Sequence, residues 1–84
     1  MDSPLVRNNL KELIIRERSM LEYRHGKKVN LIEIKSKVAS YCGTSTNNID
    51  MIYKEYSATS MYIALKLAEY FKCRVEDIFY IDED

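Results

Sequence analysis

The chain has 84 residues, of which 46% are hydrophobic, with only two glycines and one proline. This length predicts one small domain over residues 1–84 and excludes a separate effector-sensing domain. The hydrophobic content excludes a disordered chain and predicts a packed, helix-rich core. A core of this size is marginally stable alone, so we expect a homodimer.

The basic and acidic residues balance, 13 against 13, but they are unevenly distributed. A neutral domain argues against nucleic-acid binding, because a basic surface is its usual electrostatic footprint. Between Arg16 and Lys37, however, seven basic residues stand against three acidic ones, whereas Glu76–Asp84 holds five carboxylates and no base. The sequence is therefore polarised, basic early and acidic late.

No segment resembles a membrane span or a signal peptide. A span needs roughly 18 consecutive apolar residues, and a signal peptide needs a basic segment followed by an apolar one. Cys42 and Cys73 are expected to be reduced, buried thiols. We therefore expect a cytoplasmic protein that makes no contact with a membrane.

Nothing in the sequence indicates an enzyme. The chain has no nucleophile paired with a base and no glycine-rich phosphate loop. His25 is the one histidine. A metal site needs several converging ligands, so His25 is better explained as a partner for a helix C-terminus or as a solvated side chain. We expect no cofactor and no metal.

The first helix is expected over residues 4–25. Ser3 and Pro4 form a helix start, since serine caps free N–H groups and proline fits the first turn. Gly26 suits a left-handed C-cap, so the helix should end there. The apolar residues that fall on one face of this helix are Leu10, Leu13, Ile14, Met20 and Leu21.

Residues 31–55 are expected to form two helices joined by a tight turn. Asn30 and Glu33 have the spacing of a capping box and open the first of these helices. Gly43 closes it. Two helices joined by a glycine-containing turn, the second with its polar end free, have the sequence form of a helix-turn-helix.

The second helix of this pair is expected over residues 46–55. Ser45 can cap its free N–H groups. Its apolar stripe is thin and consists of Ile49 and Ile52, which should face the core. The polar residues at its start are therefore expected to point outward.

Two closing helices are expected within residues 60–80. The apolar stripe of the first contains Met61, Leu65, Ala68 and Phe71, widened by Ala64 and Leu67. A short last helix is expected to pack three apolar residues onto the core, namely Val75, Ile78 and Phe79.

The segment Val38–Phe79 resembles, without a gap, the Cro and phage-repressor class of helix-turn-helix regulators, also called the Xre-like class. The matching positions are Val38, Ala39, Gly43, Ser45, Ile49 and Ile52, followed by 64–68, Phe71 and 75–79. The resemblance implies an all-α fold, a compact five-helix bundle of the lambda-repressor-like DNA-binding type, here with an elongated first helix.

Three residues depart from the pattern of that family. Tyr53 stands where the family has glutamate, Glu55 where it has glycine, and Thr59 where it has proline. We therefore expect a differently shaped connection after the second helix of the motif.

The resemblance implies that helix 46–55 enters the major groove of DNA. The candidate base contacts are Ser45, Thr46, Asn47, Asn48 and Met51. Asparagine can pair bidentately with adenine, and the methyl groups of threonine and methionine can contact thymine, so an A/T-rich site is expected. The alternative is that these polar residues only solvate a turn and cap a helix.

Affinity is expected to come mainly from phosphate contacts. The candidate backbone contacts are Lys35, Lys54, Tyr56 and Ser57. They can equally be ordinary surface residues. Asp50 and Glu55 are expected to weaken DNA binding, because both add negative charge near the groove-facing surface.

The tyrosines divide by position. Tyr41, Tyr70 and Tyr80 are expected to be half-buried packing residues. A second group clusters around the end of helix 46–55 and the start of the next helix, and consists of Tyr53, Tyr56 and Tyr62. This group is either a dimer or partner surface or a set of ordinary surface residues.

The leading hypothesis is a repressor-like transcriptional regulator, of the kind that phages and mobile elements encode. It would bind double-stranded DNA as a homodimer and block or recruit polymerase. The alternative is a helix-turn-helix-shaped module that binds a regulatory protein and has weak or no DNA binding. The neutral charge and the acidic residues of helix 46–55 favour this alternative.

Overall fold

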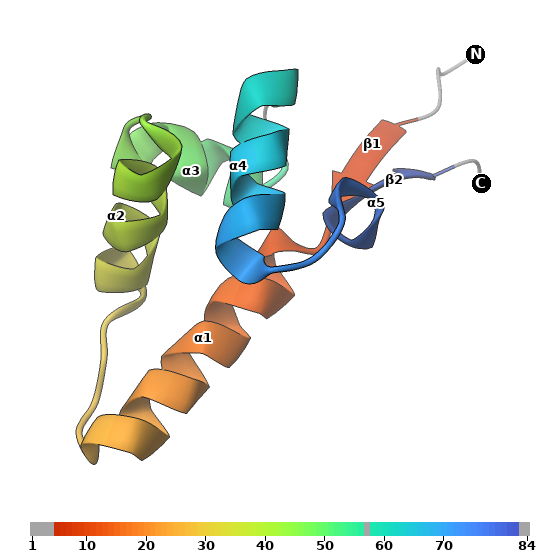
Figure 1. Ribbon diagram of the computed structural model, residues 1–84. Helices are drawn as coiled ribbons and strands as arrows, with labels where there is room; N and C mark the ends of the chain where they lie inside the picture. The colour runs from red at the N-terminus through yellow and green to blue at the C-terminus, as the bar shows by residue number, and fades with distance from the viewer. Residues whose placement is uncertain (1–4, 57, 83–84) are drawn as a thin grey trace.

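The computed structural model describes residues 5–56 and 58–82, which contain five helices and two short strands (Figure 1). In chain order these are β1 (Leu5–Asn8), α1 (Leu10–His25), α2 (Leu31–Cys42), α3 (Thr46–Tyr53), α4 (Met61–Phe71), α5 (Val75–Ile78) and β2 (Phe79–Asp82). The fold is mostly helical, as expected, but it is not all-α.

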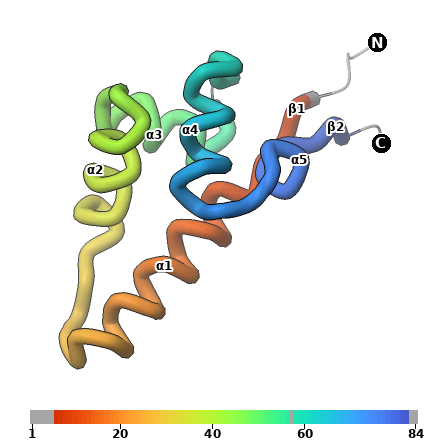
Figure 2. Tube along the Cα trace, in the orientation of Figure 1, coloured from red at the N-terminus to blue at the C-terminus, as the bar shows by residue number. Residues whose placement is uncertain are grey.

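The helix α4 lies between the α2–α3 pair and the strand pair, and it contacts both α2 and α5 (Figure 1). The long helix α1 runs obliquely away from the strands, and loop 26–30 returns from its far end to α2 (Figure 2). This arrangement gives a molecule of 48 × 25 × 21 Å. None of the helices within the described residues has the length and apolar character that crossing a membrane would require.

One hydrophobic core joins all five helices. Its fully buried side chains are Leu10, Ile14, Ile34, Val38, Cys42, Ile49, Ile52, Leu67 and Ile78. Leu13 and Leu21 pack at its margin, whereas Met20 is 54% exposed. The last helix contributes as predicted, because Ile78 is buried and Val75 and Phe79 pack partly against it.

The expectation that residues 4–25 form a helix is wrong at its start. Leu5–Asn8 is a strand that pairs antiparallel with Phe79–Asp82, with Val6 opposite Ile81. Both segments carry β-branched or aromatic residues, and this long-range pairing overrides the local helix-start signal. Ser3 and Pro4, which carried that signal, lie outside the described residues. The closing helices likewise end at residue 78 rather than 80.

Helix α1 instead begins after Asn9, where the chain turns out of the sheet. The Asn8 side-chain Oδ1 accepts a hydrogen bond from the Leu10 N–H at 2.9 Å. The Asn9 N–H donates to the Ile78 carbonyl at 2.8 Å. The start of α1 is therefore held by the strand pair, since these bonds satisfy N–H groups beside the first turn.

Gly26 and Gly43 end α1 and α2 in the left-handed conformation, as predicted, with φ of 69° and 72°. Lys72 ends α4 in the same conformation, with φ of 57°, and Glu55, one residue beyond the right-handed C-cap Lys54 of α3, is also left-handed, with φ of 62°. At Glu55 the turn is closed by bonds from Glu55 N–H to Ile52 and from Tyr56 N–H to Met51. Helix α3 therefore ends at Tyr53, two residues before the expected end of helix 46–55.

Helix α4 buries only part of the predicted stripe: Ala64, Leu67 and Ala68 are buried as predicted, and Ile63 is buried although it was not in the stripe. Met61 and Leu65 are 71% and 54% exposed, whereas its buried residues are Ile63, Ala64, Leu67 and Ala68. The sequence of α4 is apolar on nearly every side, so periodicity alone could not select the buried face. The buried face of α4 is set by the elements that pack against it, chiefly α2 and α5.

Three smaller expectations have mixed outcomes. Asn30 makes no side-chain cap bond at the start of α2, so the capping box with Glu33 does not form. Cys42 is buried, as expected, but Cys73 is only half-buried. Burial raises the pKa of both thiols.

Of the tyrosines expected to be half-buried, only Tyr70 is so. Its ring meets Tyr41 edge-on at 5.4 Å, and its hydroxyl donates to Glu17 at 2.7 Å. Burial, followed by this bond to a carboxylate, raises the pKa of Tyr70. Tyr41 and Tyr80 are 43% and 44% exposed.

Candidate nucleic-acid interface

Helix α3 is anchored from beneath and capped at its start. Ile49 and Ile52 are fully buried, as predicted, and fix its inner face to the core. The Ser45 Oγ accepts a hydrogen bond from the Asn48 N–H at 3.0 Å, which satisfies one free N–H group of the first turn. The turn between α2 and α3 is closed by a bond from the Thr44 N–H to the Ala39 carbonyl at 3.0 Å.

The polar side chains at the start of α3 are not equally available. The Asn48 Nδ2 donates to Thr44 Oγ1 at 2.9 Å, and the Thr46 hydroxyl lies 3.2 Å from that of Ser36. Asn47 is exposed, and its side chain makes no hydrogen bond within residues 5–56 and 58–82. Asn47 is therefore the side chain best placed to bind an external partner.

The other predicted contact residues lie around the outer side of α3. Met51 is half-buried, and Tyr56 is 72% exposed just beyond the helix. Ser57 lies outside the described residues. Lys35 belongs to α2 and Lys54 is the C-cap of α3, and both are engaged by the same carboxylate.

That carboxylate belongs to Asp50. Its Oδ1 lies 2.8 Å from the Lys35 Nζ and its Oδ2 lies 3.1 Å from the Lys54 Nζ. The Lys35 Nζ also lies 4.0 Å from the centre of the Tyr53 ring, a cation–π contact. The hydrogen bond from Lys35, then that from Lys54, holds the pKa of Asp50 below its usual value. The cluster of Lys35, Asp50 and Lys54 therefore carries one net positive charge.

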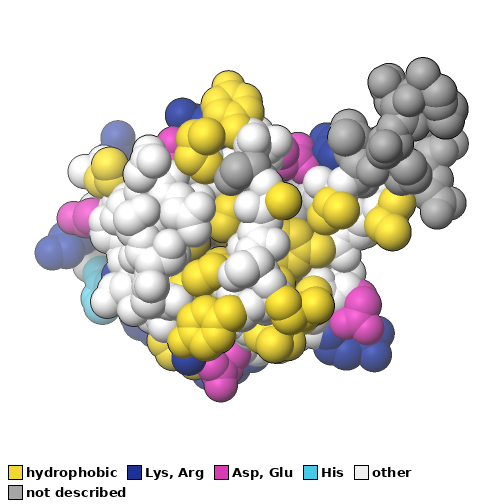
Figure 3. All heavy atoms as spheres, turned by 90° about the horizontal axis from the view of Figure 1, so that it is seen from above, with side chains coloured by type: hydrophobic (Ala, Val, Ile, Leu, Met, Phe, Trp, Pro, Cys, Tyr) yellow, Lys and Arg dark blue, Asp and Glu magenta, His cyan; other side chains and the backbone are white. Residues whose placement is uncertain are grey.

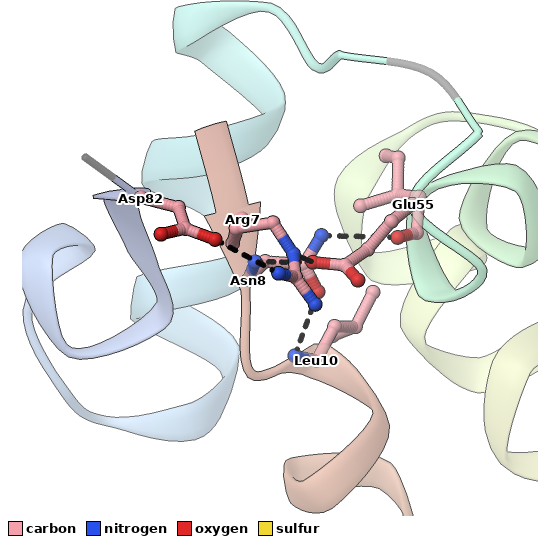
Figure 4. Close-up of polar contacts among 6 residues, drawn as sticks. Arg7, Asn8, Leu10, Glu55 and Asp82 are labelled. Carbon is pink, nitrogen blue, oxygen red and sulfur yellow. Dashed lines mark hydrogen bonds and ion pairs between the residues drawn. The ribbon is translucent and has the colours of Figure 1, made fainter. Parts of the chain in front are cut away.

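Glu55 is engaged in a similar way, by the first strand (Figure 4). Its Oε2 accepts from the Arg7 Nε and from the Asn8 N–H, each at 2.9 Å. Arg7 also reaches Asp82 at 3.1 Å, so it connects β1, β2 and the turn after α3. The bond from Arg7, then that from Asn8, holds the pKa of Glu55 below its usual value.

These contacts explain how a glutamate occupies a left-handed turn. A left-handed residue other than glycine costs roughly 1–2 kcal/mol. At Glu55 the bonds to Arg7 and to the Asn8 N–H offset that cost, and Asn8 adds a bond from its Nδ2 to the Ile52 carbonyl at 3.0 Å. At this position, where the resemblance implies a glycine, Glu55 therefore adopts a left-handed backbone, and its side chain binds β1.

Sequence reasoning missed Arg7 and Asn8 altogether. Both fell inside the expected first helix, and no contact was predicted for either. The only signal was the β-branched and aromatic content of 5–8 and 79–82, which is typical of strands. Within the described residues no group of three or more histidine, cysteine or acidic side chains is placed to hold a metal ion.

No protein-family model and no curated protein matches this chain.

The two engaged carboxylates predict how stability depends on pH. Because the pKa values of Asp50 and Glu55 are lowered in the folded state, their contribution is complete above the unfolded pKa, about 4. It is lost as the pH falls through the folded values. Thermal melts should therefore show a steeper loss of stability below about pH 4 for the natural chain than for the double variant Asp50→Asn, Glu55→Gln.

A matched control is Glu76→Gln, which removes an exposed carboxylate of α5 that forms no ion pair with another described residue. The stability of this variant should fall with decreasing pH as steeply as that of the natural chain. If the double variant loses stability in acid as steeply as the natural chain does, the ion pairs of Asp50 and Glu55 are not the cause of that loss.

Proposed function

We propose that the protein is a DNA-binding transcriptional regulator, repressor-like and of the phage or mobile-element type, that acts as a homodimer. Helix α3 lies in the major groove, with Asn47 at its exposed start reading a base edge. Since asparagine pairs bidentately with adenine, an A/T-rich site fits best.

The cluster of Lys35, Asp50 and Lys54 is the observation that supports this proposal most. A lone carboxylate on α3 would repel phosphate, but Asp50 is paired on both sides. The positive excess lies beside the second half of α3, around Asp50 and Tyr53, and phosphates flank a helix that lies in the groove. Asp50 therefore holds two lysines beside α3 and cancels one of their charges, which leaves the cluster positive.

The proposal predicts that Asn47→Ala weakens binding to a selected duplex by about 1–3 kcal/mol, or roughly 5- to 150-fold, as expected for loss of a bidentate base contact. The measurement is a fluorescence-anisotropy titration against duplexes selected from a random pool. Selection and titration are done at about 50 mM and repeated at about 200 mM salt, because phosphate contacts make affinity fall with salt.

The control is Ser19→Ala, an exposed polar residue in the middle of α1. It should leave the affinity unchanged. The proposal fails if the folded dimer binds no duplex at about 50 mM salt, the condition that favours binding through phosphates.

A second candidate function is favoured by a separate surface. Met61, Tyr62 and Leu65 are 71%, 62% and 54% exposed on α4, and Tyr56 lies in the chain before them at 72%. Hydrophobic side chains are exposed at several places on the face in Figure 3. Exposed apolar patches with tyrosine are typical of protein interfaces. A module that binds a regulatory protein would use this surface, and Tyr62→Ser would then weaken partner binding without changing duplex affinity.

A further inference from the structure

The two-stranded sheet has one edge that is closed and one that is open. On β1, the Asn8 N–H points away from β2 and donates to the Glu55 carboxylate, while the Asn8 amide bonds the Ile52 carbonyl. The turn after α3 therefore covers this edge. A further strand cannot be added next to β1 without displacing Glu55.

The outer edge of β2 is different. The Asn9 N–H bonds the Ile78 carbonyl, so alternate residues along the ladder point their backbone groups inward. By this alternation Tyr80 faces β1, and the N–H and C=O of Ile81 face outward. Neither group bonds another part of the described chain outside the strand pair. The Phe79 N–H, in contrast, already donates to the Val75 carbonyl.

The outward N–H and C=O of Ile81 indicate which strand can pair with β2 and in which register. Ile81 offers one donor and one acceptor, which is complementary to itself when two β2 strands lie antiparallel across a two-fold axis. A register centred on Tyr80 would need the engaged Phe79 N–H, so the register centred on Ile81 is favoured. This register places Asp82 opposite Tyr80 of the second copy. Tyr80 is uncharged, and its hydroxyl can donate a hydrogen bond to a carboxylate. The two Asp82 side chains are then not directly opposite each other, which avoids repulsion between like charges.

The side chains agree with this register. Val6 and Ile81 are directly opposite on β1 and β2, and they are 62% and 60% exposed. Pairing of β2 with its copy would line up four β-branched side chains across one face, Val6 and Ile81 from each chain. Such cross-strand pairs stabilise sheets, and four strands are more stable than two.

We propose that β2 pairs antiparallel with β2 of a second copy, centred on Ile81, to form a four-stranded sheet at the dimer interface. Because Glu55 closes the opposite edge, the assembly stops at two chains. In so far as the proposed function holds, Arg7 also links this interface to α3, since it bonds both Asp82 of β2 and Glu55 after α3. The two groove-binding helices would then be held at a set separation.

The test uses sedimentation equilibrium of the full chain over a range of concentrations, without DNA. The natural chain should be a dimer, and Ile81→Lys should be a folded monomer, because a charge on the edge strand opposes pairing. The control is Ile32→Lys, on α2, where the isoleucine is equally exposed at 63%. This control should remain a dimer, and circular-dichroism melts establish that each variant is folded.

Cysteine cross-linking tests the register, in a Cys73→Ser background. Opposite residues of a hydrogen-bonded antiparallel pair have Cα atoms about 5.5 Å apart, within the range of a disulfide. Ile81→Cys should therefore form a disulfide-linked dimer on oxidation. Val6→Cys, three strand spacings from its copy or about 14 Å, should not.

A monomeric natural chain would overturn the proposal and would leave the edge for a strand of a different protein. A dimeric Ile81→Lys variant, or a dimer in which Val6→Cys cross-links as readily as Ile81→Cys, would also overturn it. Duplex titration is independent of these measurements, so failure of the interface is distinguishable from failure of DNA binding.

Discussion

Replacing Ile49 with alanine is expected to lower the free energy of unfolding by roughly 2–5 kcal/mol, the largest effect of a single substitution considered for this chain. Ile49 is fully buried and fastens α3 to the core. Its truncation removes apolar burial and leaves a cavity beneath the helix. A domain of this size has a stability of only about 5–10 kcal/mol. The variant should therefore unfold at a much lower denaturant concentration than the natural chain.

The matched control is Ile32→Ala, the same truncation at a position that is 63% exposed on α2. Its effect should stay within about 0.5 kcal/mol. Both are measured by chemical denaturation followed by circular dichroism. Equal costs at Ile49 and Ile32 would contradict the placement of the core, and would indicate that Ile32 is covered in the protein in solution.

Asp50→Asn is expected to raise affinity for duplex DNA about tenfold at roughly 50 mM salt, with a steeper salt dependence. The reason is that Asp50 holds Lys35 and Lys54, at 2.8 Å and 3.1 Å, and cancels one of their two charges. Removal of the carboxylate charge releases one further cation for a phosphate. Anisotropy titrations at several salt concentrations give both the affinity and the slope.

Glu76→Gln is the control for this prediction, because it makes the same change in net charge on α5. It should alter the affinity by much less, since the charge is remote from α3 and is screened. If Glu76→Gln strengthens binding as much as Asp50→Asn does, net charge alone is responsible and α3 has no special role. If Asp50→Asn weakens binding in a folded protein, the lysines need Asp50 to hold them in position.

The helix ends show where local chemistry is sufficient. Gly26 and Gly43 adopt the left-handed conformation that they alone occupy freely, and Ser45 caps the helix that follows it. Ile49 and Ile52 face inward because they are the only strongly apolar pair at helical spacing in a polar segment. Such signals extend over a few residues, so they can be read without a structure.

The start of the chain and the face of α4 show the opposite case. Leu5–Asn8 is a strand only because Phe79–Asp82 lies beside it, more than seventy positions later. In α4 the exposed Met61 is as apolar as the buried Ile63, so the choice of face depended on the neighbouring helices. Local preference was overridden in the first case and undecided in the second.

By itself the sequence determined three helix boundaries, at Gly26, Gly43 and Ser45, and the inward face of α3, because caps and a thin apolar stripe act locally. Only the tertiary structure decided the electrostatics of the candidate site. Glu55 meets Arg7 across 48 positions, and Asp50 meets Lys35 across 15. Two carboxylates expected to oppose DNA are therefore paired inside the fold, because the charge that a surface presents depends on which side chains the packing brings together.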